Sequence, residues 1–155
     1  MTQTSSKAAL LHIAAQDLHA GKLLLRERLP ALAETMTDAA LRQLIGAELA
    51  LAERQARRLA TAAGDMAGPE NLWMTGILDD ADRDASSHQL GPILDVALIG
   101  AIRKAKAAEI VSSETAIALA GETGQAAVLA AVTANRDEEI ATDRALKERL
   151  HALTR

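Results

Sequence analysis

The stretch DVALIGAIRKAKAAEIVSSET (residues 95–115) decides the fold of this chain. Its apolar residues, continued by Ile117, recur at steps of three and four, which is the spacing of one buried side of an α-helix. Lys106 and Glu109 fall on that same side. The segment therefore predicts a long helix that directs charge toward its neighbours.

The composition extends the helical prediction to the whole chain. A length of 155 residues fits a single domain, 1–155, that can bury a core. Because the chain has no Phe or Tyr and one Trp, its core must be built from Leu, Ile, Val and Ala, which suits close helix packing. The absence of cysteine excludes disulfides, thiolate metal sites and cysteine nucleophiles. We therefore expect an all-α domain.

Glycine and proline residues mark where the helices end. They concentrate at residues 64–71, 88–92 and 120–124, and Thr37 with Asp38 supplies a further helix start. Short loops within each helical pair and a longer crossover between the pairs predict an antiparallel four-helix bundle with a short extra helix in the crossover. The expected helices span residues 6–35, 38–63, 71–86, 92–120 and 124–152.

Two residues near the helix ends carry specific expectations. Pro30 should kink the first helix without ending it, because the apolar spacing continues through Leu29 and Leu32. Thr123 should cap the start of the last helix, because its hydroxyl can accept a hydrogen bond from a free backbone N–H.

Every long helix carries polar residues near its middle, on the side that should be buried. Di-metal carboxylate bundles project Glu and His inward in this way, because two hard cations need several oxygen ligands. A single charged residue could instead lie at the border of a wide, alanine-rich side and reach solvent through its stem. The coincidence of four helices at one level favours the inward arrangement. The residues concerned are Lys22, Glu48, Gln55, Lys106, Glu109, Glu139 and Asp143.

Five segments carry a family resemblance, in order and with nearly gap-free spacing. The chain resembles the YciF and YciE group of bacterial ferritin-like stress proteins over essentially its full length. The resemblance implies a ferritin-like bundle, commonly dimeric, with a metal site presumed from inward carboxylates. The segments are DLHAGKLLLRERLPALAE (17–34), LRQLIGAELALAERQARRLATAAG (41–64), WMTGILDDAD (73–82), the stretch quoted above (95–115) and DEEIATDRALKERL (137–150).

The departures from the family pattern fall on its presumed metal ligands. Lys22 stands where the family's AEKQ segment has glutamate, and Glu48 stands where its second helix has histidine. The family's VEHYE becomes AKAAE, so that Lys106 and Ala107 replace a glutamate and a histidine while Glu109 stays. Two presumed carboxylate ligands have thus become ammonium groups, and histidine is missing.

These departures predict a degenerate site that binds no metal and no cofactor and has no catalytic residue. Carboxylates packed together without a metal repel one another and must be neutralised otherwise. Lys22 and Lys106 would supply two positive charges close to Glu48, Glu109 and Glu139. Our hypothesis is that a buried salt-bridge network has replaced the metal centre.

Other functions stay open, and the sequence does not decide whether the protein is an enzyme. Glu48, Glu109, Glu139 and Asp143 could hold one iron or manganese ion in an oxidase, a peroxidase or an iron-handling protein. The acidic segment DDADRDASS (79–87) could dock a basic partner, although a solvated charge run explains it as well. We favour a non-catalytic ferritin-like protein of the bacterial stress-response type.

Expectations about partners and location rest on broader features. The net charge of −4 is mild, Lys and Arg are scattered, and there is no aromatic platform, which disfavours nucleic-acid binding. The first residues make a poor signal peptide and no apolar stretch is long enough to span a membrane, so we expect a cytoplasmic protein. We expect a homodimer, from the resemblance and from an apolar surface around Trp73, Ile77 and Leu78, and the sequence points to no other protein partner.

Overall fold

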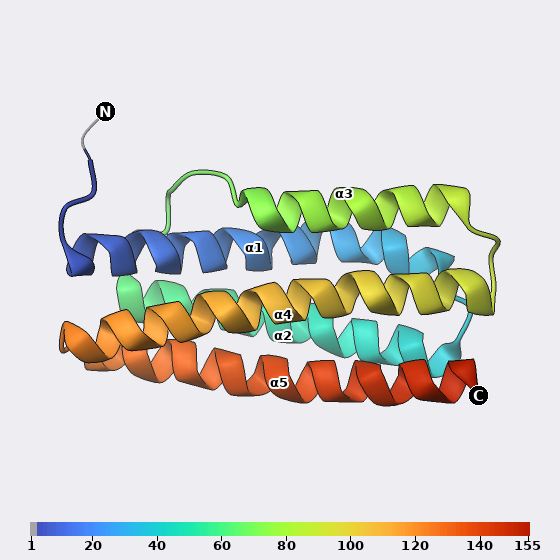
Figure 1. Cartoon of the computed structure of the whole chain (residues 1–155). Coiled ribbons are helices and arrows are strands. Elements are labelled where there is room, and N and C mark those ends of the chain that lie inside the picture. Colours follow the sequence, from blue (N-terminus) through green and yellow to red (C-terminus); the bar gives the residue numbers. More distant parts are fainter. Residues whose placement is uncertain (1–2) are drawn as a thin grey trace.

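The computed structural model describes residues 3–155, which form five α-helices and no strand (Figure 1). The all-α prediction is therefore confirmed. Within the described range, no helix is both long and apolar enough to cross a membrane. The helices are α1 (Lys7–Thr35), α2 (Ala39–Ala63), α3 (Leu72–Ser87), α4 (Pro92–Glu122) and α5 (Ala126–Thr154).

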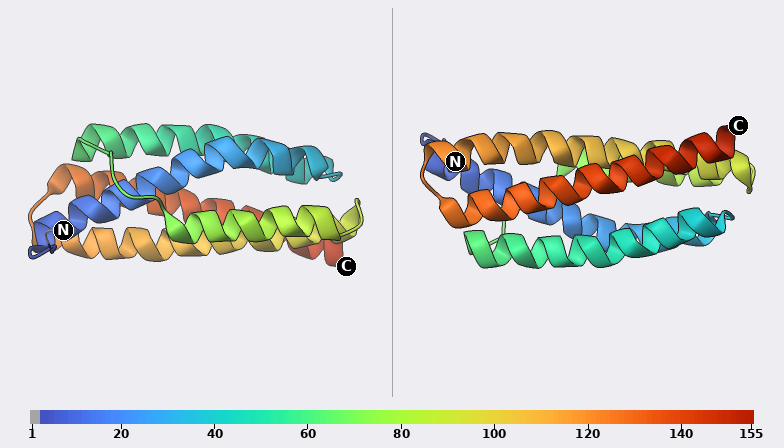
Figure 2. Two further views of the ribbon diagram at one scale, coloured as in Figure 1. Left: turned by 90° about the horizontal axis from the view of Figure 1, so that it is seen from above. Right: turned by 90° about the horizontal axis from the view of Figure 1, so that it is seen from below.

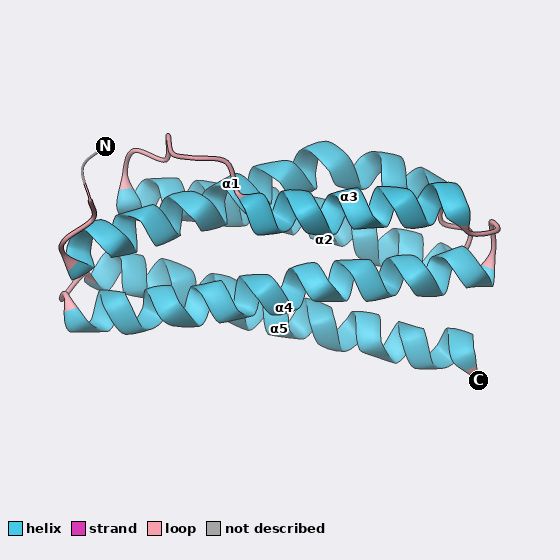
Figure 3. Cartoon of the chain, turned by 45° about the horizontal axis from the view of Figure 1, so that its top comes forward, coloured by secondary structure: helices cyan, strands magenta, loops and turns pink. Residues whose placement is uncertain are grey.

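Four long helices form a bundle, and α3 lies outside it. Helices α1 and α2 run antiparallel, as do α4 and α5, and the connection from α2 to α4 passes through α3 (Figures 1 and 3). Helix α3 packs against α1 and α4, and the view from above shows it along these two helices (Figure 2). The predicted bundle with an extra helix in its crossover is confirmed.

Local hydrogen bonds fix the starts of the first two helices. The hydroxyl of Ser6 accepts a hydrogen bond from the Ala9 N–H at 3.1 Å. The carboxylate of Asp38 accepts one from the Leu41 N–H at 2.8 Å. Both bonds satisfy backbone donors that the helix itself leaves free, which explains why these helices begin close to their predicted starts.

The expectation for Thr123 was wrong, whereas α1 does continue through Pro30. Thr123 ends α4, and its hydroxyl donates a hydrogen bond to the carbonyl oxygen of Leu119 at 2.7 Å. Gly124 has a φ of 69°, a left-handed conformation that glycine adopts without steric cost. The chain turns there, so α5 begins only after Gln125.

The apolar core consists of two clusters, one toward each end of the bundle. The larger cluster lies toward the α1–α2 loop and includes Leu25, Leu41 and Ile102. The smaller lies toward the α4–α5 loop and includes Leu18 and Val132. Burial of apolar side chains such as these decides which sides of the helices meet.

Hydrogen bonds fasten the start of α3 to α1. The indole Nε1 of Trp73 donates to Oδ2 of Asp17 at 2.9 Å. The side-chain amide of Asn71 donates to the Asp17 carbonyl oxygen at 2.8 Å, while its Oδ1 accepts from the Met74 N–H at 2.8 Å. Gly21 makes the close approach possible, because a Cβ there would lie 2.9 Å from Nδ2 of Asn71.

The apolar surface that the sequence suggested for a dimer contact faces the bundle instead. Leu78 is buried, and Trp73 and Ile77 are half-buried against the larger core cluster. On α3, these side chains face inward and cover α1 and α4. This surface gives no support to a dimer, which stays a prediction from the family resemblance.

Candidate functional site

Five charged side chains meet near the middle of the bundle, and together they are named the ion cluster. Lys22 comes from α1, Glu48 from α2, Lys106 and Glu109 from α4, and Glu139 from α5. Each is at most 2% exposed, although charged side chains are almost never fully buried without partners. None of the five reaches solvent through its stem.

The apolar spacing of the helices carries these charges inward. Leu18 and Leu25 flank Lys22 at steps of four and three, and both are buried in the core. Lys106 and Glu109 are three positions apart, which places them on one side of α4. The ion cluster therefore lies between the two apolar core clusters.

The two ammonium groups bridge the three carboxylates. Nζ of Lys106 hydrogen-bonds to Glu48 and lies 3.0 Å from Oε1 of Glu109 and 2.9 Å from Oε2 of Glu139. Nζ of Lys22 hydrogen-bonds to Glu109 and lies 2.8 Å from Oε1 of Glu139. Glu109 and Glu139 therefore each contact two ammonium groups, whereas Glu48 contacts one.

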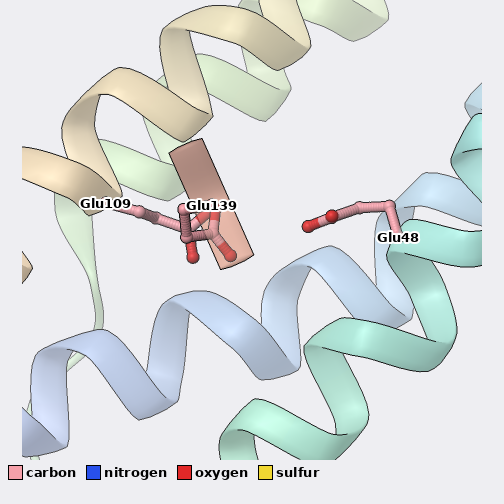
Figure 4. A group of neighbouring side chains, drawn as sticks. All are labelled: Glu48, Glu109 and Glu139. Carbon is pink, nitrogen blue, oxygen red and sulfur yellow. The ribbon is translucent and has the colours of Figure 1, made fainter. Parts of the chain in front are cut away.

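The carboxylates also lie close to one another. An oxygen from each of Glu48, Glu109 and Glu139 lies within 4.8 Å of the others. Figure 4 shows Glu48 pointing from α2 toward the neighbouring carboxylates of Glu109 and Glu139. Among the described protein atoms, Oε2 of Glu48 has no hydrogen-bond partner, and Oε1 of Glu109 and Oε2 of Glu139 contact Lys106 without an aligned hydrogen bond. Charge attraction to Lys106 therefore dominates the contacts of the Glu109 and Glu139 oxygens.

Burial and charge act in opposite directions on the pKa values of the cluster. Burial favours a neutral Glu139, but the attraction of Lys106 and Lys22 outweighs it and lowers the pKa of Glu139 to about 2. Burial also opposes the charge on Lys106, yet the three carboxylates raise its pKa well above the ordinary value. For Glu48, burial prevails and raises the pKa, because Lys106 offsets it only in part.

Two residues expected at this site lie outside the ion cluster. Gln55 is buried at the contact of α2 with α5, where its amide nitrogen lies 3.5 Å from the carbonyl oxygen of Asn135. Asp143 lies at the half-buried edge of α5 and accepts hydrogen bonds from Arg103 of α4 at 2.8 and 3.3 Å. Although Asp143 follows Glu139 by four positions on α5, its carboxylate is paired with Arg103 at the edge of the bundle, whereas Glu139 is fully buried. Asp143 is therefore not a partner of the cluster carboxylates.

A buried carboxylate at the end of the bundle was not expected from the sequence. Asp95, in the first turn of α4, accepts hydrogen bonds from the Thr37 N–H (3.0 Å), the Thr37 hydroxyl (2.8 Å) and the Asp38 N–H (2.9 Å). Arg149 of α5 donates two hydrogen bonds to the Asp38 carboxylate and lowers its pKa. The α1–α2 loop is thus tied to α4 and α5. An acidic residue in a first helical turn was the available signal, but nothing local identified its partners.

The donor set of the ion cluster does not match what a pair of metal ions requires. Ferritin-like di-metal bundles supply a carboxylate from each of four helices and histidine from two of them. The ion cluster supplies three carboxylates and no histidine. Moreover, Lys22 and Lys106 contact the carboxylate oxygens that metal ions would need, and their charge would repel a divalent cation.

Solved structures with the same fold agree with the resemblance noted in the sequence. The crystal structure of the E. coli stress protein YciF has a TM-score of 0.93 at 22% identity, covering 97% of this chain and 98% of that chain. YcfI from Rhodopseudomonas palustris has a TM-score of 0.88 at 24% identity, covering 92% of this chain and 94% of that chain. At these identities the likeness shows the fold alone.

Family membership rests on the sequence match. No curated protein matches the chain. A family model described as "Domain of unknown function (DUF892)" matches residues 7–155, a range that includes all five helices and the whole ion cluster. The chain therefore belongs to the DUF892 family.

Proposed function

We propose that this protein is a non-catalytic ferritin-like bundle of the bacterial stress-response type, in which the ion cluster takes the place of a metal centre. The observation that carries this proposal is the contact of Lys22 and Lys106 with three buried carboxylates. Buried carboxylates can be neutralised by metal ions or by ammonium groups. Here the ammonium groups perform that role.

The role of the ion cluster in this proposal is to fix how the four long helices align. Buried ion pairs often add little stability over apolar packing, but removal of one partner costs roughly 3–5 kcal/mol. Lys106 contacts carboxylates from α2, α4 and α5, and Lys22 of α1 contacts those from α4 and α5. A shift of any one helix along the bundle would separate charged atoms inside the core. The cluster would thereby favour a single alignment.

A second candidate function is the binding of one divalent ion, because three carboxylate oxygens lie within 4.8 Å of one another. That ion would belong to an oxidase, a peroxidase or an iron-handling protein. It would have to displace an ammonium group from Glu109 or Glu139, and Asp143 is engaged by Arg103. The metal-free alternative requires no such rearrangement.

Metal analysis of the purified protein tests the proposal. We expect less than stoichiometric iron and manganese, and the same thermal unfolding midpoint with and without added ferrous or manganous ion. Two ions per chain, or a higher midpoint in the presence of either metal, would overturn the proposal in favour of a metalloprotein.

We also propose that the protein forms a homodimer, on the basis of the family resemblance alone. Sedimentation at micromolar concentration should show a species of twice the chain mass. A sample that contains monomer alone under those conditions would contradict this part of the proposal.

A further inference from the structure

The ion cluster contains one more carboxylate than ammonium group. Three glutamates face two lysines, and all five side chains are buried. If every group were ionised, the cluster would carry one uncompensated negative charge inside the bundle. Buried groups in that position change their protonation state, because an unpaired charge is far less stable in a low-dielectric interior than in water.

The surrounding helices offer no further cation to compensate that charge. Helix α1 contributes Lys22, α4 contributes Lys106 and Glu109, and α5 contributes Glu139. In the described part of the chain, Lys22 and Lys106 are the two buried cationic side chains. The half-buried pairs Arg58–Glu138 and Arg103–Asp143 are each balanced by themselves.

Glu48 is the least compensated of the three carboxylates. It contacts Lys106 alone, whereas Glu109 and Glu139 each contact both lysines. Its Oε2 has no hydrogen-bond partner among the described protein atoms. A carboxylate with one ammonium contact and a free oxygen is the most favourable place in the cluster for a proton.

We propose that the ion cluster holds one additional proton, carried by Glu48, so that its five buried side chains are electrically neutral at neutral pH. Because oxygens of Glu48, Glu109 and Glu139 lie within 4.8 Å of one another, a proton on Glu48 also removes the repulsion between a third negative charge and the other two carboxylates. Burial raises the pKa of Glu48, which acts in the same direction. The inference rests on the proposed metal-free state of the cluster.

A proton bound in this way must appear in the energetics of unfolding. Glutamate in an unfolded chain has a pKa of about 4.3 and is ionised at neutral pH. Unfolding at neutral pH should therefore release the Glu48 proton. Because the folded chain binds the extra proton, the contribution of Glu48 to stability is fully present below its unfolded pKa and is lost as pH rises through its higher folded pKa.

Calorimetric unfolding in buffers of different ionisation enthalpy measures that proton. With EDTA-treated protein at about pH 7, the native chain should release close to one proton more than Glu48→Gln, whose amide mimics a neutral acid. Glu53→Gln removes an exposed carboxylate from the same helix and should behave like the native chain. Carboxyl-carbon NMR of the folded protein should show the Glu48 signal in the position of a neutral acid.

Equal proton release by the native chain and Glu48→Gln would overturn the inference, as would a Glu48 signal in the position of an ionised carboxylate. A neutral-acid signal from Glu109 or Glu139 would overturn the assignment to Glu48. These outcomes are independent of the metal analysis. Stoichiometric metal in untreated protein would defeat the proposed function, whereas a metal-free protein with an ionised Glu48 would defeat the proton alone.

Discussion

The ammonium nitrogen of Lys22 lies 2.8 Å from Oε1 of Glu139, although the two residues are 117 positions apart in the chain. They come from the first and last helices, and each also has a contact with α4. The contact therefore closes the ion cluster across the bundle. It can form only when α1 and α5 are aligned at one level, and the contacts of the same two residues with Glu109 and Lys106 extend that requirement to α4.

Removal of one ammonium group should reveal how strongly the fold depends on the cluster. Lys106→Met keeps an unbranched apolar side chain but leaves the three buried glutamates with Lys22 as their single cationic partner. We expect a loss of roughly 3–5 kcal/mol in the free energy of unfolding, measured by chemical denaturation. Lys104→Met is the control, because Lys104 lies on the same helix with 70% of its side chain exposed. Similar losses for the two variants would show that the charge on Lys106 is not required.

Acid should weaken the fold through Glu139. Its pKa is about 2 in the folded protein and 4.5 as a free side chain, so its stabilisation is present above the unfolded pKa and is lost as pH falls toward 2. At neutral pH this stabilisation by Glu139 is about 3 kcal/mol, because each unit of pKa difference between the folded and unfolded chain corresponds to 1.36 kcal/mol. Denaturant unfolding between about pH 6 and pH 3 should show a smaller decline for Glu139→Gln than for the native chain. Glu114→Gln changes an exposed position of α4 and should lose as much stability over this pH range as the native chain. An equal loss in the native chain and both variants would refute the role of Glu139.

The helices could be predicted from the sequence because burial needs a periodic apolar side. Leu18, Leu25, Ile102 and Val132 are buried as their spacing requires. Thr123 was assigned to the wrong helix because two local signals competed there. A threonine can cap a helix start, but the turn at the following glycine left it at a helix end. Propensity alone did not decide between these roles.

The positions of the ion cluster were also predictable, but its contacts were not. A charge on an apolar stripe signals either an inward site or a border residue, and four helices with that feature favoured the inward site. Which carboxylate meets which lysine depends on the reach of side chains between helices, and a single sequence does not contain that information. Asp143 illustrates the limit: it follows Glu139 by four positions, yet Arg103 holds it at the edge of the bundle.

A methyl group at Gly21 should loosen the attachment of α3. A Cβ at Gly21 would lie 2.9 Å from Nδ2 of Asn71, which is held by its hydrogen bond to the Asp17 carbonyl oxygen. Gly21→Ala should therefore lower stability and shift the fluorescence of Trp73 toward that of a solvent-exposed indole. Trp73 is the only tryptophan in the chain, so the signal reports α3 directly.

Gly46 provides the matched control for this variant. It is exposed in the interior of α2, and a Cβ there would meet no atom within 4 Å. Gly46→Ala should raise stability by about 0.5–1 kcal/mol, because alanine loses less backbone freedom in a helix. A gain of that size for Gly21→Ala as well, with unchanged fluorescence, would show that the first turn of α3 accommodates the methyl group.

The exchange of both lysines for glutamate tests whether ammonium groups stand in for metal. Lys22→Glu with Lys106→Glu would leave five buried carboxylates without a counter-charge, so the metal-free variant should be less stable than the native protein. Ferrous or manganous ion should restore stability, because an ion that binds the folded state alone adds RT ln(1 + [L]/Kd), about 2.7 kcal/mol at a hundredfold excess over Kd. The measurement is thermal unfolding of both proteins with and without metal.

A surface variant separates this effect from a general response to negative charge. Lys104→Glu with Lys147→Glu makes the same change in net charge at two exposed positions, and added metal should not stabilise it. The decisive quantity is the gain from metal in each protein: large for the buried double variant and absent for the native chain and the surface variant. If metal raises the unfolding midpoint of the native chain, a cation displaces Lys22 or Lys106 from the carboxylates. If metal leaves the midpoint of the buried double variant unchanged, the lysines do not occupy ligand positions.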